Sequence, residues 1–130
     1  MISLGATCVL MFVIYAQWCA GWERLNDFEA LCDAEDSIRA YIDKSHKWPR
    51  DWESLTPALA SRGSDVTYAR DRVDVNFAID LKSEPRADEW YLRVKSGVIP
   101  GEERNANDRL RNTVSFYSEV RRRTTNGTVK

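Results

Sequence analysis

The side chains that could do chemistry are few and scattered. The sequence contains a single histidine, His46, next to a predicted helix end, where an exposed residue is expected. Without a second histidine or a C-x-x-C pair, a zinc site would need scattered carboxylates. No P-loop, G-x-G-x-x-G or G-x-S-x-G motif occurs. We therefore predict no catalytic, metal-binding or cofactor-binding residue, and a protein that is not an enzyme.

Two groups of carboxylates were considered for catalysis or metal binding. Asp74 and Asp80 lie on one predicted strand, about 20 Å apart, which is too far for the carboxylate pair of a glycosidase. Glu29, Asp33 and Asp36 share one side of a predicted helix, but the spacing of a calcium-binding loop is absent. We interpret these three acids as part of a solvated helix face.

Three tryptophans offer a surface for ligand stacking. Trp48 and Trp52 lie in the motif W-P-x-x-W-x-x-L, and Trp90 begins a predicted strand. Pro49 ends the preceding helix and restarts the chain, so the first two rings are expected to pack back on that helix. Two interpretations stay open: Trp48, Trp52 and Trp90 fill the core, or they stack against a ligand.

An apolar N-terminal segment precedes all of these residues. The chain from Ile2 to Trp22 has no charged side chain, and as a helix it would be about 31 Å long, close to the hydrocarbon thickness of a bilayer. Three aromatic residues at its end suit a membrane–water interface: Tyr15, Trp18 and Trp22. Residues 1–22 are therefore predicted to be a transmembrane anchor in contact with lipid. Because so little chain precedes the anchor, we expect the remaining domain to lie outside the cytoplasm.

A cleaved signal peptide is the alternative interpretation of this segment. The apolar core of a signal peptide is usually about 7–15 residues long and follows basic residues, but no Lys or Arg precedes the apolar run here. The small residues Cys19 and Gly21 would still permit cleavage before Trp22. The remaining chain would then be a secreted or periplasmic binding module.

The three cysteines do not indicate a disulfide scaffold. On one helix Cys19 and Cys32 would be about 20 Å apart, whereas a disulfide needs Cα atoms within about 7 Å. We expect Cys8, Cys19 and Cys32 to be buried free thiols, with an intermolecular disulfide in a dimer as the alternative.

The segment from Glu23 to Lys44 continues the helix in amphipathic form. Its apolar residues recur at spacings of three and four and form one stripe. The charged residues, including Asp27, Asp33 and Glu35, are predicted to take the remaining surface. Glu35 and Arg39 form a predicted ion pair one turn apart. The stripe needs a sheet or further helices to cover it.

Beyond this helix the sequence predicts a small antiparallel sheet of about three strands. The strands are expected from alternating apolar residues, at Val66–Arg70, Val73–Leu81 and Trp90–Val94. A C-terminal helix follows, although residues 113–120 also alternate as a strand would. The fold class is therefore α+β. The chain divides into an anchor (1–22), a domain (23–123) and a flexible tail (124–130).

The charge balance argues against nucleic acid as a partner. The chain has 19 basic and 20 acidic residues and a formal net charge of -1. Its one run of like charges is Arg121–Arg123, near the C-terminus. Binding to a nucleic acid phosphate backbone usually requires an extended basic surface, which this composition does not predict.

The layout resembles type IV pilin-like proteins, including the pseudopilins of type II secretion. The resemblance rests on the two-part N-terminal helix and on Ile38–Leu55, where an aromatic residue, a polar turn, an aromatic–Pro pair and a Leu-bearing helix follow in order. The W-P-x-x-W-x-x-L motif also resembles that of uncharacterised membrane-anchored bacterial proteins. The resemblance implies a head built on a membrane-embedded helix. It also implies partners contacted through that helix, either copies of the chain or members of a secretion or pilus-type assembly.

The sequence departs from the pilin family at the processing site. No basic residue precedes Gly5, and Leu10 stands where the family has an acidic residue, so no functional residue is carried over. From the sequence we predict a single-pass membrane-anchored protein with a structural or assembly role, pilin-like in architecture.

Overall fold

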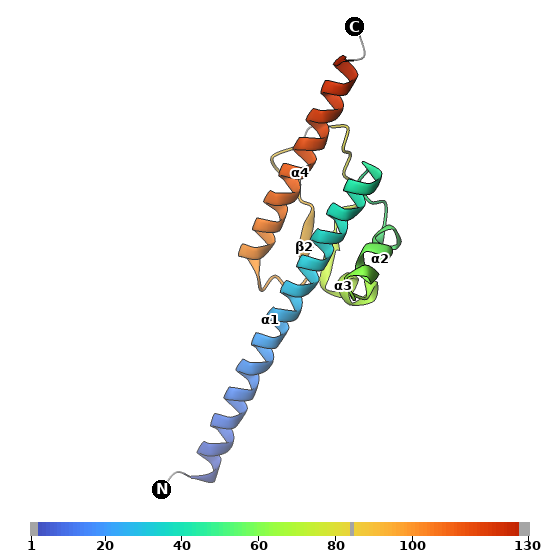
Figure 1. Ribbon diagram of the computed structural model, residues 1–130. Helices are drawn as coiled ribbons and strands as arrows, with labels where there is room; N and C mark the ends of the chain where they lie inside the picture. The colour runs from blue at the N-terminus through green and yellow to red at the C-terminus, as the bar shows by residue number, and fades with distance from the viewer. Residues whose placement is uncertain (1–2, 84, 128–130) are drawn as a thin grey trace.

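The computed structural model describes residues 3–83 and 85–127 and shows a mostly helical α+β fold (Figure 1). A long first helix rises from the N-terminus into a head formed by the rest of the chain. The elements in chain order are α1 (Leu4–Ser45), α2 (Trp52–Ser61), α3 (Val66–Arg72), β1 (Val73–Val75), β2 (Leu92–Val94) and α4 (Pro100–Gly127).

Helix α1 confirms the predicted long helix within the described residues. It is 42 residues long. Ser3 caps its start by accepting a hydrogen bond from the Ala6 backbone N–H at 3.3 Å. His46 ends it in the left-handed conformation with φ of 57°, and its N–H donates to the Ile42 carbonyl. The apolar and the amphipathic parts of the sequence thus form one uninterrupted helix.

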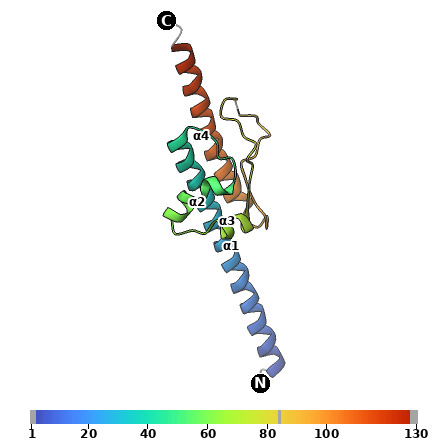
Figure 2. The same cartoon turned by 90° about the vertical axis from the view of Figure 1, so that its right-hand side faces the viewer.

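The head is organised around the upper half of α1, which packs against every other element. In both views α4 runs beside this half in the same direction and extends past it, so the two termini lie at opposite ends (Figures 1 and 2). The core contains apolar side chains from α1, α2 and α4 that are almost completely buried, namely Leu31, Ile38, Ile42, Leu55, Leu59, Leu110 and Val114.

The sheet has two antiparallel strands among the described residues, and not the predicted three. β1 pairs with β2 in the register Val73↔Val94 and Val75↔Leu92. The predicted strand to Leu81 stops after Val75 because the Asn76 side chain starts a turn: its oxygen accepts from the Ala78 N–H at 3.1 Å and its amide donates to the Trp90 carbonyl at 2.9 Å.

The segment predicted as the first strand, Val66–Arg70, is instead part of helix α3. Asp65 caps this helix by accepting from the Thr67 N–H at 3.0 Å. The helical backbone buries Ala69 and turns the ring of Tyr68 towards α1, where its hydroxyl donates to the Asn26 carbonyl. Capping and packing therefore outweigh the β preference of these residues.

Residues 113–120, for which the sequence allowed either a helix or a strand, belong to helix α4. Pro100 stands at its first position, where a missing N–H costs nothing. Ala106, Leu110 and Val114 recur every fourth residue and are buried against the head. The helix continues to Gly127, into the segment predicted as a tail, and residues 128–130 lie outside the described residues.

Candidate functional site

The lower half of α1 stands apart from the head. Its most apolar 18-residue window has no residue buried against the rest of the chain, and by length and composition the helix is able to cross a membrane once. The predicted interface aromatics, Tyr15, Trp18 and Trp22, are all exposed. The rings of Trp18 and Trp22 stack with centroids 6.0 Å apart.

Two of the three remaining tryptophans pack on aromatic neighbours within the head. Trp48 is a core residue whose indole N–H donates to the Asn76 carbonyl at 2.9 Å, with its ring 5.6 Å from that of Tyr91. The half-buried Trp52 meets the ring of Phe77 edge-on at 5.9 Å. Trp48 therefore fills the core, as one of the two interpretations predicted.

The third tryptophan, Trp90, has a different neighbour. It is half-buried, and the Arg93 guanidinium lies 4.1 Å from its ring centroid. Among the described residues no ring contact joins Trp48, Trp52 or Trp90 to another of the three. The three tryptophan rings therefore do not form one continuous surface for ligand stacking through contact with each other.

The most distinctive polar feature is a set of three buried carboxylates on α1: Asp27, Asp33 and Glu35. The prediction that they take the exposed surface of the helix is wrong. Each carboxylate is paired with an arginine from a different part of the head. We call these pairs the three arginine clamps: Asp27–Arg72 at the end of α3, Asp33–Arg62 after α2, and Glu35–Arg109 in α4.

The lowest clamp lies where α1 enters the head. One Arg72 nitrogen donates to Asp27 at 3.1 Å and to Glu23 at 3.0 Å. The Ser96 hydroxyl donates to the second oxygen of Asp27 at 2.7 Å. The hydrogen bond to Glu23, followed by that to Asp27, raises the pKa of Arg72 above its ordinary value.

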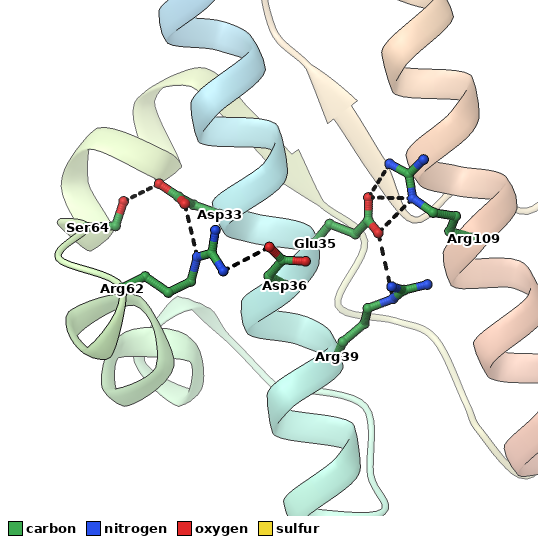
Figure 3. A network of polar contacts seen from close by, with 7 residues as sticks. All are labelled: Asp33, Glu35, Asp36, Arg39, Arg62, Ser64 and Arg109. Atoms are coloured by element: carbon green, nitrogen blue, oxygen red, sulfur yellow. Dashed lines mark hydrogen bonds and ion pairs between the residues drawn. The ribbon is translucent and has the colours of Figure 1, made fainter.

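The middle clamp contains Asp33 and Asp36, two of the three acids whose spacing was compared with that of a calcium-binding loop. Arg62 donates to Asp33 at 3.1 Å and forms an ion pair with Asp36 at 2.8 Å, while the Ser64 hydroxyl donates to the other oxygen of Asp33 (Figure 3). These two carboxylates therefore hold a guanidinium. In the part of the chain that the structure describes, no cluster of three His, Cys, Asp or Glu side chains is arranged to bind a metal ion.

The upper clamp is a two-point contact between helices. Arg109 of α4 donates to both oxygens of Glu35, with distances of 2.6 Å and 2.9 Å (Figure 3). The predicted partner Arg39 lies farther from Glu35, at 3.6 Å. The hydrogen bond that Arg109 donates to Glu35 raises the pKa of Arg109 above its ordinary value. A fork of this kind fixes the angle of the guanidinium as well as its distance.

Together the clamps define how α1 sits in the head. A buried carboxylate without a partner costs about 1–3 kcal/mol or more. A shift of α1 by one residue would move all three carboxylates away from their arginines. The clamps therefore select one register and rotation for α1, while the apolar core supplies most of the stability.

The cysteines are free, as predicted, but they are not buried. Cys8 is exposed, and Cys19 and Cys32 are half-exposed. Burial of the thiol raises the pKa of Cys32 above its ordinary value, and the nearby carboxylates of Asp36 and Glu35 add to this effect. Cys32 is therefore a weak nucleophile.

One signal in the sequence could have revealed the lowest clamp. Asp27 precedes Leu31, Ala34 and Ile38 at spacings of four, three and four, so it continues the buried apolar stripe of α1. A charged residue on such a stripe indicates a buried partner. The arginines themselves carry no such signal, because they are 29, 45 and 74 residues away in the chain.

The clamps are suited to a structural role. Each carboxylate is neutralised by a guanidinium, which cannot act as a base in proteins. Within the described ranges no histidine is hydrogen-bonded to them, and the two hydroxyls that are, from Ser64 and Ser96, donate to carboxylates already paired with an arginine. No protein-family model, curated protein or solved structure matches this chain.

Proposed function

We propose that the protein is anchored in a membrane by a single pass and has a structural or assembly role, with a pilin-like architecture. The observation that supports this most strongly is the division of α1. One continuous helix is uncharged and bare from Leu4 to Trp22 and then becomes the centre of the head. Lipid would cover the bare half, and the head would lie outside the cytoplasm.

An exposed strip on α1 supports the assembly role. Leu25 and Phe28 lie beyond the uncharged segment, yet they are 53% and 44% exposed. They follow Trp18 at spacings of seven and three, which keep all three side chains on the contact seam of paired helices. Two copies in one membrane hold their α1 helices in the same direction, so this strip would pack against the same strip of a second copy.

The anchor is tested on the full-length protein in its native host. Membranes are washed with alkaline carbonate, and the retained protein is sequenced from its N-terminus. An anchored protein stays with the membrane and keeps the residues before Trp22, because hydrocarbon contact resists carbonate. A soluble form that begins near Trp22 would rule out the anchor.

Self-association is tested by cysteine cross-linking in membranes. Phe28→Cys is introduced into a chain whose three native cysteines are changed to serine, and Ser61→Cys, on the exposed end of α2, is the matched control. Mild oxidation should give a dimer with cysteine at position 28 and none at position 61. Equal cross-linking at both positions would indicate random collision.

The alternative is a secreted or periplasmic binding module released by cleavage near Gly21. It is favoured by a cavity of about 710 Å³ between α1 and α2, lined in part by Tyr41, Pro57 and Ala58. None of Trp48, Trp52 and Trp90 lines this cavity. Ligand binding there should raise the unfolding temperature of the cleaved protein, whereas an unchanged unfolding temperature across a broad ligand panel would count against this function.

A further inference from the structure

A cavity of about 580 Å³ lies at the base of the head, where α1 leaves its uncharged segment. It is formed by α1, α3 and the loop that follows β2. The lining residues that matter here are Ala20, Arg24, Tyr68, Asp71, Lys95 and Val98. Neither the proposed membrane anchor nor the alternative binding module uses this cavity.

The position of the cavity along α1 places it at the level of lipid head groups in an anchored protein. Its lower edge, Ala20, lies between Trp18 and Trp22, the predicted interface aromatics. Its upper edge, Asp27, is about 7.5 Å farther along the helix than Trp22. The polar layer on each side of a bilayer is about 5–7 Å thick, so the cavity spans this layer.

The charges around the cavity are of two kinds. Arg72 is held by Glu23 and Asp27 and therefore belongs to the wall. Arg24 and Asp71, by contrast, form no ion pair within the described ranges, and Lys95 is held loosely by Asp74 at 3.7 Å. The cavity thus presents two available cations and one available anion to whatever enters it.

This pattern matches a head group that carries both charges. Two oxygens of a phosphate fit the planar guanidinium of Arg24, and a third can face the Lys95 ammonium. A primary ammonium can donate to the Asp71 carboxylate, which a quaternary ammonium is unable to do. The apolar surfaces of Ala20 and Val98 face the same space and suit the start of the acyl chains.

We propose that this cavity binds the head group of a zwitterionic phospholipid with a primary amine. Arg24 and Lys95 contact the phosphate, and Asp71 accepts hydrogen bonds from the ammonium. The inference rests on the proposed membrane anchor. It adds a lipid preference that the anchor alone does not require.

The test uses the full chain in nanodiscs with equal amounts of phosphatidylethanolamine, phosphatidylcholine and phosphatidylglycerol. Native mass spectrometry then counts the lipid molecules that stay bound to the protein after it is released from the nanodisc. The wild-type protein should retain phosphatidylethanolamine over phosphatidylcholine by about fivefold to tenfold. Asp71→Asn should remove this preference, and Arg24→Gln should lower retention of both lipids.

Two control variants separate the cavity from general surface charge. Arg70→Gln lies on α3 and Asp88→Asn lies in the loop before β2; both positions are exposed and outside the cavity lining. Both should retain lipid as the wild type does. Unchanged thermal unfolding of Arg24→Gln and Asp71→Asn would show that their effects come from lost contacts.

Four results would overturn the proposal. The first is equal retention of phosphatidylethanolamine and phosphatidylcholine by an inserted chain, which would leave the anchor intact. The second is a preference for anionic phosphatidylglycerol. The third is micromolar binding of free O-phosphoethanolamine, which would assign the cavity to a soluble phosphoester. A chain that does not insert at all would overturn both this inference and the proposed function.

Discussion

The two halves of α1 place polar and apolar side chains in opposite environments. In the lower half the large apolar residues, such as Phe12 and Ile14, are exposed. In the upper half three carboxylates are buried, and two of them are less than 6% exposed. The same helix thus exposes hydrocarbon at one end and buries charge at the other.

The difference shows that burial follows the available partner and not the residue type alone. A carboxylate enters the core where an arginine from another element meets it. A bare apolar helix is stable where hydrocarbon outside the chain takes the place of a core. The upper half has partners within the chain, and lipid is the partner that we propose for the lower half.

The largest expected contrast compares two leucines of α1, Leu31 buried in the head and Leu25 exposed near its base. Leu31→Ala should lower the free energy of unfolding of the head by about 3 kcal/mol, because Leu31 is 2% exposed and its loss leaves a cavity. Leu25→Ala, the matched control, should change it by less than about 0.5 kcal/mol. Guanidinium unfolding in detergent micelles measures both. A similar loss in both variants would mean that the head extends farther down α1.

A smaller effect is expected from removing one arginine clamp. Arg109→Ala leaves the buried Glu35 with only the more distant Arg39, at 3.6 Å, and should lower the free energy of unfolding of the head by about 2 kcal/mol. The control Arg123→Ala removes an exposed ion pair with Glu119 and should cost less than about 0.5 kcal/mol.

A double variant then separates charge from packing at the same clamp. Glu35→Leu combined with Arg109→Leu removes both charges and should recover most of the lost stability, because apolar side chains can replace a buried ion pair. Thermal unfolding of the wild type, Arg109→Ala, Arg123→Ala and the double variant measures this recovery. No recovery would show that the clamp stabilises the head by more than neutralising Glu35.

The smallest expected effect is on the pH dependence of stability and comes from the buried hydroxyl of Tyr91. Burial raises the pKa of Tyr91, and the nearby Glu89 adds to the shift. Above the ordinary tyrosine pKa of about 10, the unfolded chain loses this proton while the folded chain keeps it, so the free energy of unfolding falls as the pH rises. Tyr91→Phe should reduce that fall between pH 9 and 11 and leave the stability near pH 8 little changed. An identical alkaline profile in both proteins would contradict the assignment.

The sequence predicted the long helix and its two-part character well. The absence of charge up to Trp22 and the spacing of Leu31, Ile38 and Ile42 are local patterns, and the structure preserves both. The C-terminal helix and the pairing of Val73–Val75 with Leu92–Val94 were also within reach. These features depend on residues that are near neighbours in the chain.

The remaining features depend on partners that local patterns do not reveal. Val66–Arg70 contains residues that favour strands, but the cap at Asp65 and the position of Asp27 on α1 favour a helix that brings Arg72 to its clamp. Ile79 and Leu81 are buried as predicted, although no strand carries them, because burial and strand pairing are separate requirements.

The continuity of α1 also has a mechanical consequence. Sharp bends in helices arise at proline, at glycine–serine pairs or at inserted residues, and within Leu4–Ser45 the sequence offers a single internal glycine near the junction, Gly21. The helix is about 63 Å long. The head is attached at its C-terminal end, so a small change in the tilt of the helix moves the head by a large distance. A tilt of the membrane half by about 10° would swing the Ser45 end by about 11 Å. In the anchored protein that we propose, bilayer thickness would thereby influence the direction in which the head points.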